Sequence, residues 1–258
     1  MKRIPGSYKR IILGTPITPA ARWSELDGKS FCVSFAEPRD LDRAIAAVGD
    51  NEILLLDNGA FSAWKRGIEI DWAEYWAWAI DAMERCSNAV AVIPDVIGGD
   101  PDANWMMAAE AVRKYVPRKY TGRLMFVWHM DEPIDVLIDA ARLFNFVAIG
   151  SCAAFDITKG AKPGTKFYER MREAWDAIGA VEALGLSERP FVHMMRGLGK
   201  LKDFAWDSAD STNVAINYKR WAATNAPTSP APVKAMVERL SYEINGAAEL
   251  PLTMKEAA

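Results

Sequence analysis

The segment 206–213 is dense in side chains that can do chemistry. It reads Trp-Asp-Ser-Ala-Asp-Ser-Thr-Asn and supplies two carboxylates, three hydroxyls and a carboxamide. Such a group of polar side chains is costly to bury unless it faces water or a ligand. Asp and Ser also form turns by hydrogen bonding to the nearby backbone. The segment alone therefore predicts either a polar turn or part of a functional site.

Polar residues also follow several other apolar runs of strand length, which favours the site over the turn. Together with Asp210, the residues at these positions are Asp57, Asp95, His129, Ser151 and His193. In a barrel of parallel strands the C-terminal ends of all strands meet around one mouth, so residues distant in sequence converge there. Each of them alone would be an ordinary turn residue. As a set they predict the site of an enzyme.

The runs expected to form strands alternate with amphipathic helices. Strands are expected over 11–13, 31–35, 53–56, 89–93, 124–127, 146–149, 190–192 and 214–216. Apolar residues at helical spacing predict helices over 41–48, 71–83, 104–115, 134–143, 166–184 and 233–244. About eight such units predict an α/β fold, a (β/α)8 TIM-like barrel in a single domain. A doubly wound open sheet is the alternative, although no Gly-x-Gly-x-x-Gly follows its first strand.

The end of the chain differs from the rest in composition. We expect the barrel to occupy residues 1–225, and the segment 226–258 to form a Pro-rich linker and a C-terminal helix. No internal repeat of solenoid length is evident. The domain organisation expected is therefore one barrel with a short C-terminal extension.

Composition is that of an ordinary soluble globular protein. Half of the 258 residues are hydrophobic, and the formal net charge of −3 argues against a generally basic nucleic-acid-binding surface while leaving room for a local basic groove. Cys32, Cys86 and Cys152 lie far apart without CxxC spacing, so neither a disulfide framework nor a cysteine zinc site is expected. The first apolar run is too short for a signal peptide, and no later run reaches membrane length. We expect a cytoplasmic protein without membrane contact.

Three kinds of chemistry fit the predicted set. Two carboxylates flanking an acetal carbon can act as nucleophile and general acid/base to break a glycosidic bond, and Asp210 and Asp57 would fill those roles. Alternatively, both histidines with several aspartates would hold a catalytic metal, although no HxH or HExxH spacing is present. In a third interpretation Ser208 or Ser211 is a nucleophile with His193 as base, but the chain has no Gly-x-Ser-x-Gly elbow. We rank the three in this order.

Aromatic and basic residues near the ends of the expected strands are further candidates. Trp64 and Trp128 would lie at the mouth, whereas the three tryptophans of 72–78 are expected to pack a helix. Arg196 stands beside glycines and would bind a phosphate through its side chain and the backbone. The basic residues of 113–119 are expected to form a solvated helix end and loop.

Two motifs are specific when they are taken together. Residues 56–61 read Leu-Asp-Asn-Gly-Ala-Phe, and residues 207–211 read Asp-Ser-Ala-Asp-Ser. They resemble motifs of the tRNA-guanine transglycosylase superfamily, especially its small phage and bacterial relatives associated with 7-deazaguanine modification of DNA. The first resembles the Asp-Ser-Gly-Gly-aromatic turn, whose aspartate is the general acid/base, and the second resembles the nucleophile segment. The resemblance implies Asp57 as general acid/base and Asp210 as nucleophile.

Three weaker motifs extend the same resemblance. Pro94-Asp95 stands where the family has an aspartate that binds the purine edge, and Ile149-Gly150-Ser151 is similar to its glycine-rich loop that contacts the base. The loop 195–199, Met-Arg-Gly-Leu-Gly, is similar to the family's Met-Gly-x-Gly loop, which precedes the nucleophile. With the two stronger motifs, the resemblance covers the chain from about Asp57 to Asn213.

The chain also departs from the family pattern. The tRNA enzymes carry a zinc site of three cysteines and a histidine after the nucleophile, but no Cys or His follows Asp210 here. A barrel without the zinc subdomain is therefore expected, and DNA is more plausible than tRNA as the substrate. Where the family offers a glutamine to the base, this chain has Trp128-His129, so the identity of the accepted base stays open.

The resemblance implies a pentosyltransferase that replaces guanine in a nucleic acid by a 7-deazapurine through a covalent aspartyl-sugar intermediate. Asp95 would accept hydrogen bonds from the base, with backbone contacts from Gly150 and Ser151. Phe61 or Trp128 would stack on a base flipped out of duplex DNA. The other residues expected to contact the substrate are Asn58, Gly59, His129, His193, Arg196, Asp207 and Ser208.

The expected partners are a nucleic acid and a free 7-deazapurine base, and no cofactor or metal is expected. A homodimer or a partner protein stays open. Two alternatives also stay open: a glycosyl hydrolase or transferase that acts on free nucleosides, and a catalytically silent barrel that binds a base.

Overall fold

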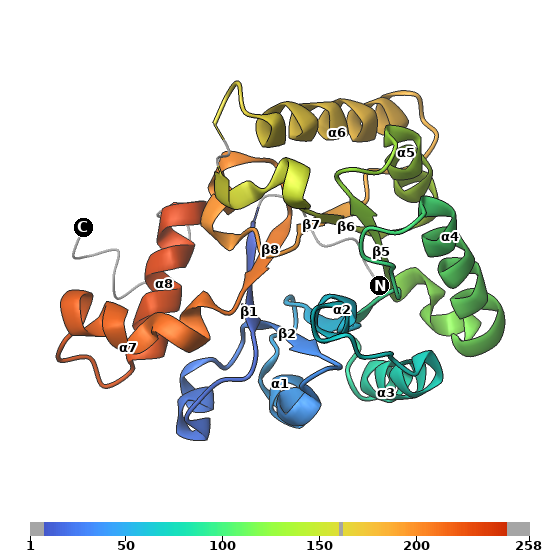
Figure 1. Cartoon of the computed structure of the whole chain (residues 1–258). Coiled ribbons are helices and arrows are strands. Elements are labelled where there is room, and N and C mark those ends of the chain that lie inside the picture. Colours follow the sequence, from blue (N-terminus) through green and yellow to red (C-terminus); the bar gives the residue numbers. More distant parts are fainter. Residues whose placement is uncertain (1–7, 160–161, 247–258) are drawn as a thin grey trace.

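The structure is a computed structural model that describes residues 8–159 and 162–246, and at its centre eight parallel strands close into a barrel (Figure 1). Neighbours in the chain are neighbours in the barrel, and β8 closes the ring by pairing with β1. The strands are β1 (Arg10–Gly14), β2 (Ser30–Ser34), β3 (Leu54–Asp57), β4 (Ala89–Val92), β5 (Leu124–His129), β6 (Phe146–Gly150), β7 (Phe191–Met194) and β8 (Ser208–Ser211). The predicted fold class is confirmed.

Helices surround the barrel, except that α2 lies inside the outer ring (Figure 1). They are α1 (Leu41–Ala47), α2 (Ala60–Arg66), α3 (Trp72–Arg85), α4 (Pro101–Glu110), α5 (Ile134–Leu143), α6 (Lys166–Ala183), α7 (Asn213–Asn225) and α8 (Pro232–Asn245). Side chains cap several of these helices, as when Asp71 accepts the N–H of Ala73 at 2.8 Å. Within residues 8–159 and 162–246, no helix is long and apolar enough to cross a membrane.

The predicted helix at 104–115 begins earlier and ends differently in the structure. Asp100 accepts the N–H of Asp102 at 3.0 Å and Pro101 takes the first helical position, so α4 begins there. After Glu110 the chain continues as a short π-helical turn, η3 (Ala111–Tyr115). The predicted start at residue 104 was therefore three residues too late.

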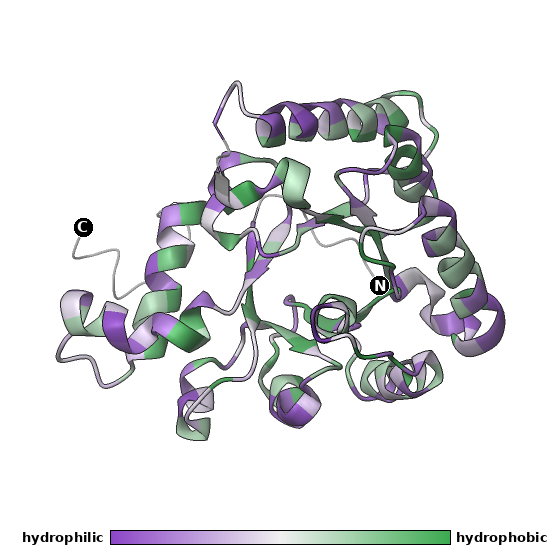
Figure 2. Cartoon of the chain, viewed as in Figure 1, coloured by the Kyte–Doolittle hydropathy of each residue, from purple (hydrophilic) through white to green (hydrophobic). Residues whose placement is uncertain are grey.

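Side chains of the strands alternate between the barrel interior and the surrounding helices. Ile12, Leu55 and Met125 fill the interior, whereas Leu56 and Phe126 point outward into a second apolar layer under the helices. Because both faces of a strand in such a barrel are buried, the strands read as unbroken apolar runs. Figure 2 shows this contrast, with hydrophobic strands and helices that are hydrophilic on their outer surfaces.

The eighth strand is the exception, and the prediction that placed it at 214–216 is wrong. Those residues lie in the first turns of α7, where Val214 is buried and Ile216 is 71% exposed. The strand is the polar segment just before them. Its side chains Ser208 and Asp210 belong to the barrel interior and mouth, so no apolar run marks it. Residues 208–211 of the polar segment therefore form a strand of the barrel itself.

The C-terminal helix packs onto the barrel wall. Val233, Met236 and Val237 of α8 are buried in the same apolar layer as the outward faces of the strands. A carboxylate oxygen of Glu25 accepts the backbone N–H of Val233 at 2.8 Å and so joins the start of α8 to the segment after β1. The predicted helix at 233–244 is confirmed. Residues 247–258, the end of the expected C-terminal extension, lie outside the described residues.

Candidate active site

The C-terminal ends of the strands bring most of the predicted residues to one end of the barrel. The register pairs Asp57 with Ser34 and Gly150 with His129. The charges of Asp95 and Asp210 both act on Asp57, so the three carboxylates from β8, from the end of β3 and from the loop after β4 share one site. This end of the barrel, defined by these residues, is the mouth.

Asp57 ends β3 at the mouth and is held from both sides. It accepts the backbone N–H of Gly59 at 3.2 Å and a hydrogen bond from Ser34. Loss of hydration raises the pKa of Asp57, the Ser34 bond lowers it, and the charges of Asp210 and Asp95 raise it further, with a net upward shift. Gly59 has φ of +78°, and a Cβ there would lie 3.1 Å from the Ala36 nitrogen. The turn thus needs a glycine to present Asp57, and the result is a carboxyl that retains its proton more firmly than usual.

Asp210 lies on β8 and is fixed by the loop after β7. One of its oxygens accepts the backbone N–H of Arg196 at 2.6 Å. Arg196 has φ of 57°, and among the described residues other than glycine it alone has a positive φ. The unusual backbone conformation directs this N–H at the carboxylate, so Asp210 is held in one orientation.

A buried histidine lies behind Asp210. His193 is fully buried on β7, and its Nδ1 is 2.8 Å from the Ser208 hydroxyl oxygen. Its Nε2 lies 3.3 Å from an Asp210 oxygen, yet this contact is not a hydrogen bond, and Nε2 has no hydrogen-bond partner among the described residues. A proton on Nε2 would face Asp210 and stabilise its negative charge. Ser208 therefore fixes the imidazole, and the imidazole backs the carboxylate.

Arg196 and Phe61 form the rim of the mouth. The guanidinium carbon of Arg196 lies 3.7 Å from the centroid of the Phe61 ring, which is a close cation–π contact. The Phe61 ring is 5.8 Å from that of Trp64, whose side chain is 61% exposed. This arrangement joins α2 to the β7 loop. The Arg196 guanidinium lies over the Phe61 ring, so the stacking of a base on Phe61 stays a prediction.

A chain of buried polar groups lies on the other side of the mouth. His129 Nε2 is 3.0 Å from Asp95 and its Nδ1 is 3.2 Å from Glu132. Asn104 donates to the same Glu132 oxygen at 2.8 Å. On the far end, the Asn58 amide donates to Asp95 at 2.7 Å. Asn58 and His129 thus contact Asp95 and hold it in place.

Two carboxylates change the charge of His129. Burial lowers its pKa, but hydrogen bonds to Asp95 and Glu132 and the charges of both outweigh burial and raise the pKa to about 10. The imidazole is therefore protonated at neutral pH and places a positive charge between Asp95 and Glu132. We expect the stability that this charge adds to be complete below pH 6.5 and to be lost as the pH rises through about 10.

The variant His129→Gln tests this effect. Its free energy of unfolding should be lower than that of the unaltered protein at pH 6.5 by a few kcal/mol, on the order expected for a shift of this size, and the difference should shrink toward pH 10. Denaturant unfolding at a series of pH values measures it. An equal difference at every pH would contradict the charged imidazole.

Gly150 is needed because the His129 ring lies against it. A Cβ at this position would be 2.9 Å from His129 Cδ2, closer than real contacts allow. We expect Gly150→Ala to displace the imidazole and to reduce the free energy of unfolding by roughly 1–3 kcal/mol. Gly179→Ala is the matched control, since nothing lies within 4 Å of a Cβ there and α6 should gain up to about 1 kcal/mol. Chemical denaturation of both variants measures the two changes; equal effects would contradict the contact.

Two of the predicted residues, Trp128 and Asp207, lie in places that differ from those expected. Trp128 is fully buried, points away from the mouth, donates its indole N–H to Pro133 and lies under Arg170, so the expectation that it stacks on a base is wrong. Asp207 lies at the opposite end of the barrel, where it pairs with Arg189 at 3.0 Å and accepts the N–H of Val192 at 2.7 Å. The expectation that Asp207 contacts the substrate is therefore wrong, because the residue lies away from the mouth.

Other candidates are near the mouth but are not open to a ligand. Ser208 is fully buried and bonded to His193, and Asn58 is 2% exposed, so both act from behind the residues they hold. Ser151 is partly exposed at the end of β6. Asp57 and Asp210, like Ser151, are partly exposed.

Several residues of the site were not predicted from the sequence. Ser34 bonds to Asp57, and Glu132 with Asn104 completes the buried chain at His129. A sequence signal existed for Glu132, because it follows His129 by three residues in the next loop, and this short spacing can bring its carboxylate to the imidazole. Ser34 and Asn104 gave none, since each looks like an ordinary polar residue of a strand or a helix.

The cysteines and histidines do not gather into one cluster. Burial and the charges of Asp210 and Asp57 raise the pKa of the Cys32 thiol well above its usual value, so it stays protonated. His129 and His193 each have separate partners. In the part of the chain that the structure describes, no three His, Cys, Asp or Glu side chains are grouped so that they could hold a metal ion.

Comparison with known proteins adds to the description of the fold. Neither a protein-family model nor the sequence of a curated protein matches the chain. A structure of tryptophan synthase from Mycobacterium tuberculosis in space group F222 matches with a TM-score of 0.51 and 14% identity, over 93% of this chain and 94% of that chain. The open form with BRD0059 bound matches with a TM-score of 0.50 and 12% identity, over 93% and 94% of the two chains. At such low identity, the likeness to tryptophan synthase shows that this chain shares its barrel fold.

Proposed function

We propose that the chain is a base-exchange transglycosylase that replaces guanine in a nucleic acid, DNA rather than tRNA, by a 7-deazapurine. The observation that carries the proposal is the meeting of Asp57 and Asp210 at the mouth in unlike surroundings. Asp57 has a raised pKa, whereas an Asp210 oxygen accepts the N–H of Arg196. Two carboxylates with different environments suit one acid and one nucleophile.

The exchange would run in two displacements at C1′ of the target nucleotide. An Asp210 oxygen attacks C1′, the bond from C1′ to N9 of guanine breaks with its electron pair on the base, and Asp57 gives that base its proton. Guanine leaves neutral, and the sugar stays bound to Asp210 as an ester. The 7-deazapurine then gives its N9 proton to the Asp57 carboxylate and attacks C1′, which frees Asp210 and returns Asp57 to its acid form.

Asp95 suits the role of holding the base. After its bonds to Asn58 and His129, each of its oxygens still has a lone pair that can accept from the N1 and N2 donors of guanine. The protonated His129 imidazole lies 3.0 Å from one of these oxygens. Phe61 would stack on the base once the Arg196 guanidinium moves off its ring.

Incorporation of labelled guanine tests the proposal. We expect the purified protein to transfer radiolabelled guanine into double-stranded or single-stranded DNA, and not into tRNA, without any added cofactor. Exchange on free guanosine but on no polymer would point to a nucleoside-level enzyme. Guanine binding without any incorporation would point to a silent base-binding barrel, and either result would overturn base exchange on nucleic acid.

A further inference from the structure

A groove opens beside the mouth, between α7 and the segment that follows β1. Its volume is about 320 Å³. One wall is formed by Thr212, the N-cap residue of α7, with Ile216 and Lys219 of α7, and the other is the turn from Thr15 to Thr18. In Figure 1, α7 lies outside the barrel, on the side of β1. The groove was not part of the predicted site, and none of the residues assigned to base exchange lines it.

The inner end of this groove lies next to the nucleophile. Thr212 follows Asp210 by two residues, and a Cβ on Gly14, the last residue of β1, would lie 2.9 Å from the Thr212 methyl carbon. The groove therefore begins where β8 and β1 end. From there it follows α7 outward by about two helical turns to Lys219.

The chemistry of the walls favours an anion with apolar parts. Arg39 and Lys219 both line the groove, and among its described lining residues none is acidic. Arg39 Nε lies 3.3 Å from a Glu37 oxygen, and Lys219 has no carboxylate partner among the described residues. Pro16 and Ile216 supply apolar surface between these charges, and the Thr15 hydroxyl is already donated to the Cys32 carbonyl.

From this arrangement we propose that the groove binds the sugar–phosphate backbone of a single DNA strand next to the nucleotide at Asp210. Lys219 and Arg39 would each contact a phosphate, and the Thr18 and Thr212 hydroxyls would donate to its oxygens. The apolar surface of Pro16 and Ile216 would contact the sugars and bases of the strand. Inorganic phosphate alone would leave this apolar surface uncovered. The inference rests on the proposed function, since it takes the strand to be the one whose base is exchanged.

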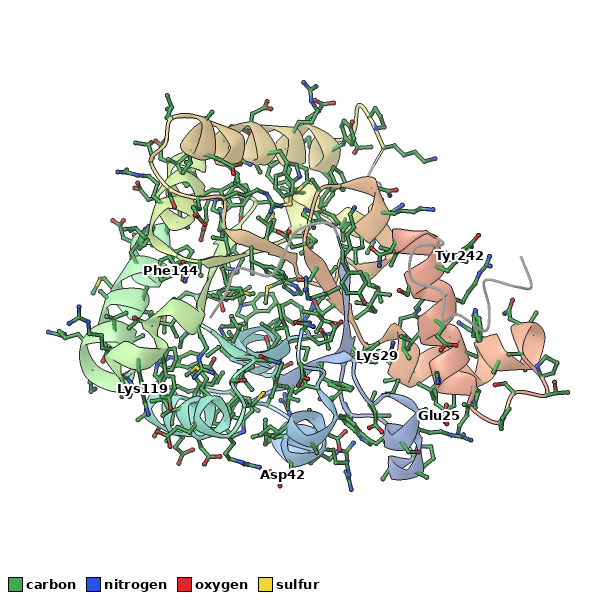
Figure 3. The ribbon with its side chains drawn as sticks, turned by 180° about the vertical axis from the view of Figure 1, so that it is seen from behind. Glu25, Lys29, Asp42, Lys119, Phe144 and Tyr242 are labelled. Atoms are coloured by element: carbon green, nitrogen blue, oxygen red, sulfur yellow. The ribbon has the colours of Figure 1, made fainter. Side chains whose placement is uncertain are left out.

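Binding of a fluorescein-labelled single-stranded DNA dodecamer, followed by anisotropy at several salt concentrations, tests the groove. Each phosphate contact on a single strand contributes a salt slope of about 0.7, or about 5-fold in affinity near 0.1 M salt. We therefore expect Lys219→Gln to weaken binding about 5-fold, and Lys219→Gln with Arg39→Gln about 25-fold with a slope lower by about 1.4. Arg118→Gln is the matched control, because it removes an exposed cation on the side of Lys119, far from α7 (Figure 3).

The outcomes separate the groove from the exchange reaction. Binding by the double variant within 2-fold of the unaltered protein, or an equal loss in Arg118→Gln, would overturn the groove. The same loss for guanosine monophosphate or inorganic phosphate as for the dodecamer would replace the strand by a free phosphate. Guanine incorporation by the unaltered protein, measured on the same DNA, tests the proposed function separately. If the double variant incorporates guanine as fast as the unaltered protein at low DNA concentration, the base-exchange proposal would stand but the groove proposal would be overturned.

Discussion

Replacing Asp210 by Asn is expected to lower base exchange by on the order of 10⁴-fold or more, because the variant lacks the carboxylate that we propose as the nucleophile. The amide is nearly the same size, and its oxygen can still accept the Arg196 N–H that holds Asp210 now. The fold and base binding should therefore be retained. Single-turnover incorporation of labelled guanine measures the loss, and denaturing gel electrophoresis of a quenched reaction shows whether the protein–DNA adduct has also disappeared.

Asp139→Asn is the matched control for this change. Asp139 lies on α5 and is exposed, where it pairs with Arg142 at 3.3 Å, so the same loss of one charge should leave the rate unchanged. An Asp210→Asn protein that still forms the adduct would show that another group attacks C1′. Loss of activity in both variants would point to net charge and not to the nucleophile.

Replacing Asp57 by Asn should lower the rate of exchange by about 10²- to 10⁴-fold, the usual contribution of a general acid. The loss should fall on the chemical step, because Asp57 does not hold the base in the proposed mechanism. The pKa of Asp57 is raised by burial and by the neighbouring charges of Asp210 and Asp95. The acid form is the one that gives a proton, so the rate of guanine departure in the unaltered protein should fall as the pH rises through that raised pKa.

The variant Ser34→Ala tests the role of Asp57 by changing its pKa and not by removing its carboxyl group. The Ser34 hydrogen bond lowers the pKa of Asp57, so its removal should move the fall in rate to higher pH. Asp57→Asn should remove the fall altogether. A pH profile of single-turnover guanine release for the three proteins measures both effects. An identical profile in Asp57→Asn and the unaltered protein would show that Asp57 is not the acid.

The sequence could predict a strand of the barrel where the side chains on both of its faces are apolar. Seven strands have apolar residues on both faces and were found as continuous runs, as with Leu54 to Leu56 of β3. In β8 the interior residues are Ser208 and Asp210, so the apolar signal is missing and the strand was placed five or so residues too late.

Parity along a strand explains the errors at the site. Successive side chains of a strand point to opposite faces, so of the adjacent Trp128 and His129 only one can reach the mouth. Sequence alone did not decide which, and the structure shows that it is His129. Asp207 and Asp210 are similar in type, but three residues of strand separate them by about 10 Å, which is enough to put Asp207 at the other end of the barrel. Contacts such as that of Asn104 with Glu132 depend on how a helix packs, which no local pattern records.

The two histidines described above have a practical consequence. The chain contains only two, and they lie behind opposite walls of the mouth, His193 next to Asp210 and His129 next to Asp95. Any signal specific to imidazole, such as a ring nitrogen resonance, therefore comes from the walls of the mouth and from nowhere else in the protein. The protein thus carries one built-in reporter beside the group that would attack the sugar and another beside the group that would hold the base.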